Sequence, residues 1–240
     1  MKRMREGFRG RSLGRAATLV ACTCITLLPA IINGFPFVYS DTGTYLKSAF
    51  EGYIPFDRPY WYGAFILATS GGGLTLWGVA IAQAVLCAAY ILRVSKLLGP
   101  HGKAKRTALI ACAVLTAGTG LGWYAGQLIP DIFTSIGLLA VYMLLRGRDG
   151  ILFRAFDILV IIAACWMHLS NLVILPLSGL VLIFLSRSVL SIPIRRALVL
   201  WSAVVAMSWG GLACANRILD GEFQVSRSGP TLLMGRMVDL

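Results

Sequence analysis

The sequence predicts an all-α protein, a polytopic bundle of about seven transmembrane helices with its N-terminus in the cytoplasm. Hydrophobic residues make up 58% of the chain and charged residues only 13%, whereas about a quarter of a typical soluble domain is charged. The mean hydropathy is +0.78. Several stretches approach the roughly 20 apolar residues that cross a bilayer, and the polar breaks between them are short. This pattern leaves little room for a separate soluble domain.

Hydrophobic runs predict where the spans lie. The seven expected spans cover residues 16–35, 74–92, 107–123, 132–145, 156–167, 172–186 and 197–213. Three of them, from 132, 156 and 172, are shorter than a full crossing, so they borrow flanking residues or lie where protein and water replace lipid. The chain then divides into a basic cytoplasmic N-terminus at 1–15, a transmembrane domain at 16–215 and an outward tail at 216–240.

Basic residues support this topology, because cytoplasmic loops carry an excess of Lys and Arg. With the N-terminus inside, the outward side receives few of the 22 basic residues, namely Lys47, Arg58, Arg217, Arg227 and Arg236. The outward side holds most of the ten acidic residues, namely Asp41, Glu51, Asp57, Asp131, Asp220, Glu222 and Asp239. The net charge of +12 is therefore explained by topology and attraction to anionic lipid, and it does not indicate nucleic-acid binding.

The six cysteines fall in or beside the predicted spans. No C-x-x-C pair and no histidine spacing typical of a zinc site is present. We interpret them as small apolar residues that fill space between helices, and we expect neither a disulfide nor a structural metal.

The first outward loop, residues 36–59, is the longest connection and contains Asp41 directly after the first span. Asp is a favoured residue at a helix N-terminus, so Asp41 has a structural interpretation as the cap of a short interfacial helix over 44–51. It also has a functional one, because a carboxylate at the membrane surface can carry out chemistry there. The local sequence favours the two about equally.

The segment 60–73 follows this loop and is apolar for only about ten residues before Ser70-Gly71-Gly72-Gly73 interrupts it. It is too short to cross, so we interpret it as re-entrant or interfacial. The glycines permit a sharp reversal.

Two later outward turns bring further ionisable side chains to the same face. Asp131 follows Pro130 at the start of a predicted helix, where it either caps that helix or serves a site. His168 lies in Trp166-Met167-His168, where it either bonds to a neighbouring helix or acts at membrane depth. We expect Asp41, Asp131 and His168 to border one cavity open to the outer face and to lipid.

These three loops together resemble the GT-C superfamily of integral-membrane glycosyltransferases. Those enzymes take a sugar from a polyprenyl-phosphate carrier, and their first extracytoplasmic loop bears an acidic residue often followed by a Tyr, as Asp41 and Tyr45 are here. Pro130-Asp131 is similar to a later acidic contribution. The resemblance covers residues 16–215, but Thr42 follows Asp41 where many members carry a second acidic residue. This departure leaves open whether the protein uses a divalent cation.

The resemblance implies a role for each candidate. Asp41 would be the general base on an acceptor hydroxyl, and Asp131 or His168 would orient that acceptor. Lys47 or Arg58 would provide the cation for the donor phosphate. The partners would be the lipid bilayer, the polyprenyl-phosphate sugar and a glycan, lipid or protein acceptor. Short loops favour a bacterial inner membrane.

Two other functional classes stay open. A transporter or channel subunit could place these ionisable residues along a polar pathway, and a noncatalytic assembly protein would need no carboxylate. GT-C enzymes usually have eleven or more spans, and the apolar end of the chain at 226–240 lacks a terminating polar segment. We therefore expect a fragment or a truncated reading frame.

Overall fold

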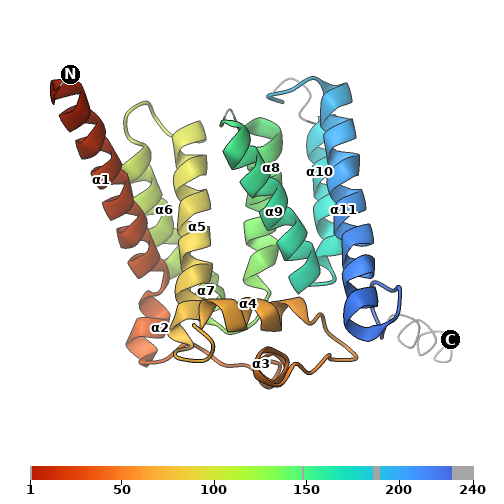
Figure 1. The fold of residues 1–240 in the computed structure, drawn as a ribbon. Coiled ribbons are helices and arrows are strands. Elements are labelled where there is room, and N and C mark those ends of the chain that lie inside the picture. Colours follow the sequence, from red (N-terminus) through yellow and green to blue (C-terminus); the bar gives the residue numbers. More distant parts are fainter. Residues whose placement is uncertain (1, 148, 186–189, 229–240) are drawn as a thin grey trace. The chain divides into compact units, whose positions relative to one another are not determined.

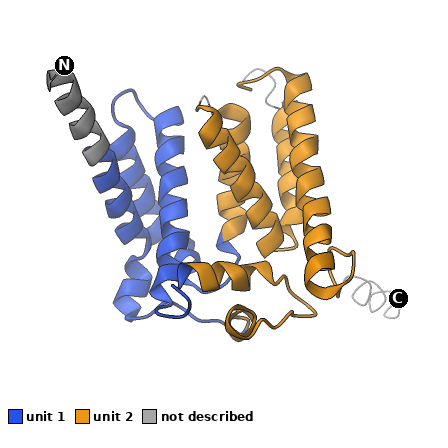
Figure 2. Cartoon of the chain, in the orientation of Figure 1, with its two compact units in different colours: residues 1–40, 69–132 blue, residues 41–68, 133–240 orange. Residues whose placement is uncertain are grey.

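The computed structural model describes residues 2–147, 149–185 and 190–228. Within these ranges the chain forms eleven helices and no strand beyond an isolated bridge, which confirms the predicted all-α class (Figure 1). The chain divides into two compact units. Unit 1 contains residues 1–40 and 69–132, and unit 2 contains residues 41–68 and 133–240 (Figure 2).

Unit 1 is built from three long helices and two short ones. Its helices are α1 (Lys2–Thr26), α2 (Leu28–Asn33), α5 (Trp77–Leu98), α6 (Ala104–Gly118) and α7 (Leu121–Gly126). The long helices α1, α5 and α6 pack against one another around small buried side chains, including Cys22, Ala88, Ala108 and Cys112. Small residues let helix backbones approach closely, so these cysteines occupy the space-filling positions that the sequence predicted.

A polar side chain in the core of unit 1 fixes the short helix α7. Gln83 of α5 is fully buried, and its Nε2 donates to the carbonyls of Ala125 at 3.1 Å and Gln127 at 2.8 Å. The same segment pairs with Phe37, whose N–H donates to Gly126 and whose carbonyl accepts from Leu128, both at 2.9 Å. This arrangement holds the turn that ends at Asp131.

Unit 2 contains a bundle of four helices and two short helices. They are α3 (Thr42–Glu51), α4 (Trp61–Thr69), α8 (Ile132–Arg146), α9 (Ile151–Met167), α10 (Asn171–Leu185) and α11 (Ile194–Asp220), with the last residue of α4 and the first of α8 assigned to unit 1. Helices α9, α10 and α11 pack against one another. Figure 1 shows α3 and α4 lying across one end of the bundle.

Three indole N–H groups connect the helices of this bundle. Trp201 donates to the carbonyl of Pro176 at 3.1 Å, Trp209 to Leu172 at 3.0 Å and Trp166 to Ser208 at 3.0 Å. The first two join α11 to α10, and the third joins α9 to α11. Each large apolar side chain therefore also satisfies a carbonyl, which is how buried tryptophan is usually accommodated.

Helices α3 and α4 meet at a glycine. A Cβ at Gly63 of α4 would lie 2.6 Å from Cβ of Ser48 in α3, so only glycine allows this approach. Helix α4 then packs on the bundle through Phe65 against Phe133 of α8, with ring centroids 5.1 Å apart, and Trp61 against Trp166 of α9, at 4.9 Å. The loop that carries Asp41 is thus anchored to the bundle.

All seven predicted spans coincide with helices, although their continuity differs. In the described residues, α5 and α11 are long and apolar enough to cross a membrane by length and composition. Helices α8 and α10 have 15 residues each, about 22 Å, which is short of the roughly 30 Å hydrocarbon core. Seven crossings and a cytoplasmic N-terminus stay predictions.

Two predicted spans are broken in the structure. The span at 16–35 divides into α1 and α2 at Leu27, because Pro29 near the start of α2 cannot donate the helical hydrogen bond. The span at 107–123 divides into α6 and α7 because Thr119 is extended, with φ −137° and ψ 178°. Treating either stretch as one continuous helix was wrong.

Two helices extend beyond the predicted spans, while the predicted domain boundaries at 15 and 215 stay predictions. Helix α1 runs through residue 15 without interruption, since Lys and Arg are good helix formers, and α11 continues to Asp220, past the expected end at 213. Of the predicted tail at 216–240, residues 229–240 lie outside the described residues.

The segment 60–73 contains a short helix followed by three glycines in the left-handed conformation, and its re-entrant or interfacial placement stays a prediction. Helix α4 is followed by Gly71, Gly72 and Gly73 at φ values of 67°, 73° and 100°, a left-handed conformation that glycine adopts without strain. Nine residues of helix extend only about 14 Å, so α4 is too short to cross a membrane.

Candidate functional site

Asp41 occupies the N-cap position of α3, but its side chain makes no capping hydrogen bond. Its backbone carbonyl begins the helix by accepting from the N–H groups of Thr44 and Tyr45 at 3.1 and 3.3 Å. The carboxylate instead pairs with Arg58, with Oδ2 2.6 Å from Nη1. The cap position is therefore correct, and the carboxylate is directed to another partner.

Arg58 pairs with two carboxylates. Its Nε donates to Oδ2 of Asp57 at 3.0 Å, while Nη1 contacts Asp41. The side chain of Arg58 is 22% exposed, that of Asp41 39% and that of Asp57 58%. The hydrogen bond to Asp41 is the main cause that raises the pKa of Arg58 above its ordinary value. The guanidinium therefore stays positively charged throughout the pH range in which proteins are normally folded.

Two buried tyrosines pack against each other next to the ion pairs of Arg58 with Asp41 and Asp57, which we call the Arg58 network. The guanidinium carbon of Arg58 lies 5.9 Å from the ring centroid of Tyr45, within cation–π range. Tyr45 is 4% exposed and makes an edge-to-face contact with the fully buried Tyr62, with centroids 4.9 Å apart. Tyr62 in turn packs against Phe133. The two loop residues Asp41 and Arg58 thus rest on an aromatic base that belongs to α3, α4 and α8.

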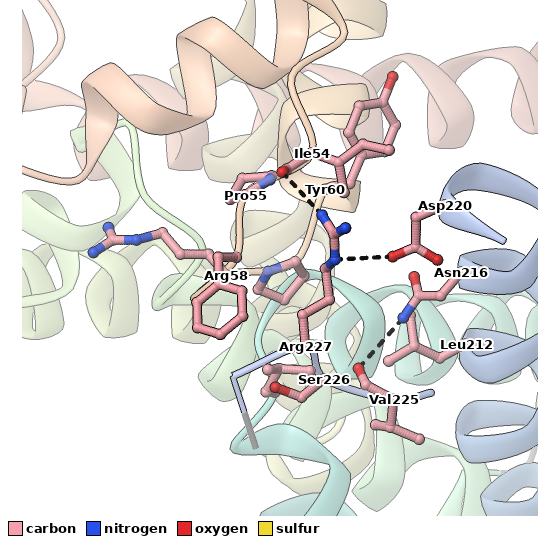
Figure 3. A pocket seen from close by; sticks show the side chains of 13 residues that line it. Ile54, Pro55, Arg58, Tyr60, Leu212, Asn216, Asp220, Val225, Ser226 and Arg227 are labelled. Carbon is pink, nitrogen blue, oxygen red and sulfur yellow. Dashed lines mark hydrogen bonds and ion pairs between the residues drawn. The ribbon is translucent and has the colours of Figure 1, made fainter. Parts of the chain in front are cut away.

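A pocket in unit 2 lies beside this network and shares Arg58 with it. Its polar lining includes Arg58, Tyr60, Asn216, Asp220 and Arg227. Figure 3 shows the guanidinium groups of Arg58 and Arg227 pointing in different directions. The pocket volume is about 20 Å³, roughly enough for one ordered water molecule. In this conformation it does not accommodate a sugar.

The segment after α11 closes the pocket. Arg227 Nε lies 3.2 Å from Oδ2 of Asp220, whose side chain is only 5% exposed, and Nη1 donates to the carbonyl of Ile54 at 3.4 Å. Asn216 donates to the carbonyl of Gln224 at 2.8 Å. These bonds tie residues 221–228 to the end of α11 and to the loop at 52–60 between α3 and α4.

His168 ends helix α9 and does not line this pocket. Its backbone is extended, its N–H donates to the carbonyl of Ala164 at 3.2 Å, and its carbonyl accepts from the N–H of Asn171 at 2.9 Å. The adjacent Leu169 contributes to the lining of the pocket, whereas neither His168 nor Asp41 does so among the residues described. This pocket is therefore not the predicted cavity.

Asp131 and Lys47 are the remaining predicted site residues. Asp131 belongs to unit 1, in the turn before α8, while Asp41 and His168 belong to unit 2. Lys47 is exposed, and its Nζ lies 4.7 Å from the ring centroid of Tyr53. Positions two apart on a helix do not share a face, so Lys47 is directed away from Tyr45. Of the two predicted cations, Arg58 is the one in contact with Asp41. A single cavity bordered by Asp41, Asp131 and His168 stays a prediction.

Several residues at this end of unit 2 were not selected from the sequence. Asp220 and Arg227 were assigned to the outward face but not to a site, although opposite charges after the last span could have suggested a pair. Asn171 was also missed. It is fully buried, accepts from Thr134 Oγ1 at 2.9 Å and donates to the carbonyl of Ala164 at 2.9 Å. The sequence feature that could have identified Asn171 is a polar residue at the start of an apolar helix.

Comparison of the chain with models of protein families, with curated proteins and with solved structures finds no match.

Proposed function

We propose that this protein is a GT-C-like membrane glycosyltransferase that moves a sugar from a polyprenyl-phosphate donor to an acceptor at the outer face of a bacterial inner membrane. The proposal includes the seven-span topology with a cytoplasmic N-terminus. It places α3, α4 and the loop between them at the outer surface, where the partly exposed Tyr60 and Trp61 suit the interface between headgroups and hydrocarbon.

The observation that carries the proposal is the paired carboxylate of Asp41. An Asp that served only as a helix cap would direct its oxygen to the backbone N–H groups of the first turn. Asp41 instead contacts a permanently charged guanidinium at 2.6 Å while staying 39% exposed. A carboxylate and a cation held together at a polar surface are the two groups that transfer from a phosphate-activated sugar requires.

Each group has a defined task in this reaction. Asp41 accepts the proton of the acceptor hydroxyl as its oxygen bonds to the anomeric carbon. The bond from that carbon to the phosphate oxygen breaks, and its electron pair leaves with the polyprenyl phosphate. Arg58 stabilises the negative charge that develops on this leaving group, because a guanidinium binds phosphate oxygens in a bidentate geometry.

The ion pair of Asp41 and Arg58 also implies that the donor binds before Asp41 acts as a base. In the free protein the two carboxylates of Asp41 and Asp57 neutralise Arg58. A donor phosphate competes with them for the guanidinium, and displacement of Asp41 from Nη1 releases a carboxylate that is free to act as base. Donor binding thereby activates the base only when the sugar is present.

The described residues do not fit a divalent cation. No group of three or more His, Cys, Asp and Glu side chains among them is close enough to hold a metal ion, and Arg58 lies between the two nearby carboxylates. We therefore assign the positive charge at the donor phosphate to Arg58.

The decisive experiment is transfer from a labelled polyprenyl-phosphate sugar by the purified protein in lipid. Asp41→Asn should lower the turnover by about 10²- to 10⁴-fold, the usual contribution of a general base. Asp57→Asn is the matched control, since Asp57 also contacts Arg58 but is more exposed. It should change turnover by less than about tenfold, because exposed ion pairs contribute little. Equal losses in both variants, or no turnover by the native chain, would refute the assignment.

One observation favours a transporter as the second candidate. Asp157 lies within a predicted span, on α9, and is only 1% exposed. Carboxylates inside membrane spans commonly mark ion or proton pathways. Proton or ion flux into liposomes that is lost in Asp157→Asn, with no sugar transfer by the native protein, would support this alternative.

A further inference from the structure

An apolar groove in unit 2 is lined by residues of α8 and α10. Its volume is about 440 Å³, and its lining is apolar except for Tyr142 and Ser178. On α10 the wall is formed by Leu177, Val181 and Leu185, which are 58%, 47% and 81% exposed. Residues four apart lie on one face of a helix, so these three form a continuous apolar stripe.

The length of the groove matches one leaflet of a bilayer. Its α10 wall runs from Leu177 to Leu185, which corresponds to about 12 Å of helix. The hydrocarbon core of a bilayer is about 30 Å thick, so one leaflet contributes about 15 Å. A single acyl chain lying along α10 would fill this length.

A positive charge stands at one end of the groove. The guanidinium carbon of Arg146 lies 5.3 Å from the ring centroid of Tyr142, a groove residue one helical turn earlier. Nε of Arg146 is buried and has no hydrogen-bond partner among the described residues. A buried donor without a partner is unfavourable, and a phosphate oxygen is the acceptor that a guanidinium binds best.

We propose that this groove binds one acyl chain of an anionic membrane phospholipid whose phosphate contacts Arg146. The inference rests on the membrane placement in the proposed function, under which Arg146 lies at the cytoplasmic surface, where anionic lipids are concentrated. It does not depend on glycosyl transfer. The apolar stripe holds the chain, and the cation at its end selects the headgroup.

Native mass spectrometry of the full chain in detergent tests this binding. The protein is titrated separately with phosphatidylglycerol and with phosphatidylcholine that carry the same acyl chains. We expect phosphatidylglycerol to bind at least about fivefold more tightly, which is the effect of one basic residue near an anionic surface. Arg146→Gln should remove this preference. Arg195→Gln is the charge-matched control, since Arg195 is an exposed residue in the first turn of α11, and it should keep the preference.

Two variants that fill the groove test the acyl-chain contact. Ser178→Phe should weaken binding of both lipids by a similar factor, and Val181→Phe provides a second variant should the first fail to fold. Equal affinity of the native chain for the two lipids would overturn the proposal, as would equal effects of Arg146→Gln and Arg195→Gln. A groove-filling variant that keeps lipid binding but dissociates a dimer would assign the groove to a second copy of the chain. A chain that binds phosphatidylglycerol selectively but transfers no sugar would support the lipid site and refute the proposed enzyme.

Discussion

A matched pair of glycine substitutions tests the helix packing on which the site depends. Gly179 of α10 faces Trp201 of α11, and a Cβ added there would overlap the indole ring. Trp201 is 2% exposed, and its N–H donates to the carbonyl of Pro176. The indole ring of Trp201 therefore cannot move away from an added Cβ without losing its packing or its hydrogen bond. Gly210 of α11 has no neighbouring atom within 4 Å of an added Cβ.

The free energies of the two substitutions should have opposite signs. Overpacking at Gly179 costs about 1–3 kcal/mol, and a lost indole hydrogen bond costs about 1 kcal/mol more. The better helix propensity of alanine offsets about 1 kcal/mol of this loss in the free energy of unfolding. Gly179→Ala should thus destabilise the protein by about 1–3 kcal/mol. Gly210→Ala has only the propensity gain and should stabilise by about 0.5–1 kcal/mol.

Thermal unfolding of both variants in the same detergent measures the difference. About 1 kcal/mol changes the midpoint by about 2–4 °C in a chain of this size. Gly179→Ala should therefore lower the midpoint by about 2–12 °C, while Gly210→Ala raises it slightly. A Gly179→Ala protein as stable as the native chain would show that α10 and α11 do not pack at this position, and the orientation of α11 would have to be revised.

Three further predictions concern polar groups that form contacts within one unit, Gln83 in unit 1 and Asn171 and Arg227 in unit 2. Gln83→Leu removes two hydrogen bonds and leaves their buried carbonyls without a donor, so it should lower the free energy of unfolding by about 2–4 kcal/mol in a denaturant titration. Asn171→Ala should cost about 1–3 kcal/mol in the same measurement, because a buried amide that joins two helices is lost. Arg227→Gln breaks the pair with Asp220. It should lower the free energy of unfolding by about 1–3 kcal/mol, because the nearly buried Asp220 carboxylate loses its charged partner. It should also increase hydrogen exchange in residues 221–228, and unchanged exchange there would contradict the assigned contact.

The sequence was sufficient to locate the helices because apolar runs of this length have few alternatives. Every predicted span contains helix, and the left-handed conformation at Gly71, Gly72 and Gly73 is one that glycine readily adopts. The breaks between α1 and α2 and between α6 and α7 were harder to predict from the sequence. Pro29 could have indicated the first of them, since proline interrupts helical hydrogen bonding. The second, at Thr119, depends on tertiary contacts that a hydropathy pattern does not record.

The candidate site was predictable only in part. Asp41 and Arg58 were both selected, but their direct contact was not, because it depends on how the loop folds over the aromatic base of Tyr45 and Tyr62. The grouping of Asp131 with Asp41 came from topology alone. Topology assigns residues to a surface, whereas distances across that surface depend on helix packing.

The Arg58 network explains why a carboxylate at this position need not be a cap. A cap interaction would hold the Asp41 carboxylate against the N–H groups of α3, which belong to the helix and cannot leave. Pairing with Arg58 also holds the carboxylate, but another anion can displace Asp41 from the guanidinium. A base that is neutralised by an exchangeable cation can respond to an anionic substrate. The value of Asp41 for chemistry therefore depends on its neighbour Arg58 as much as on its own position in the chain.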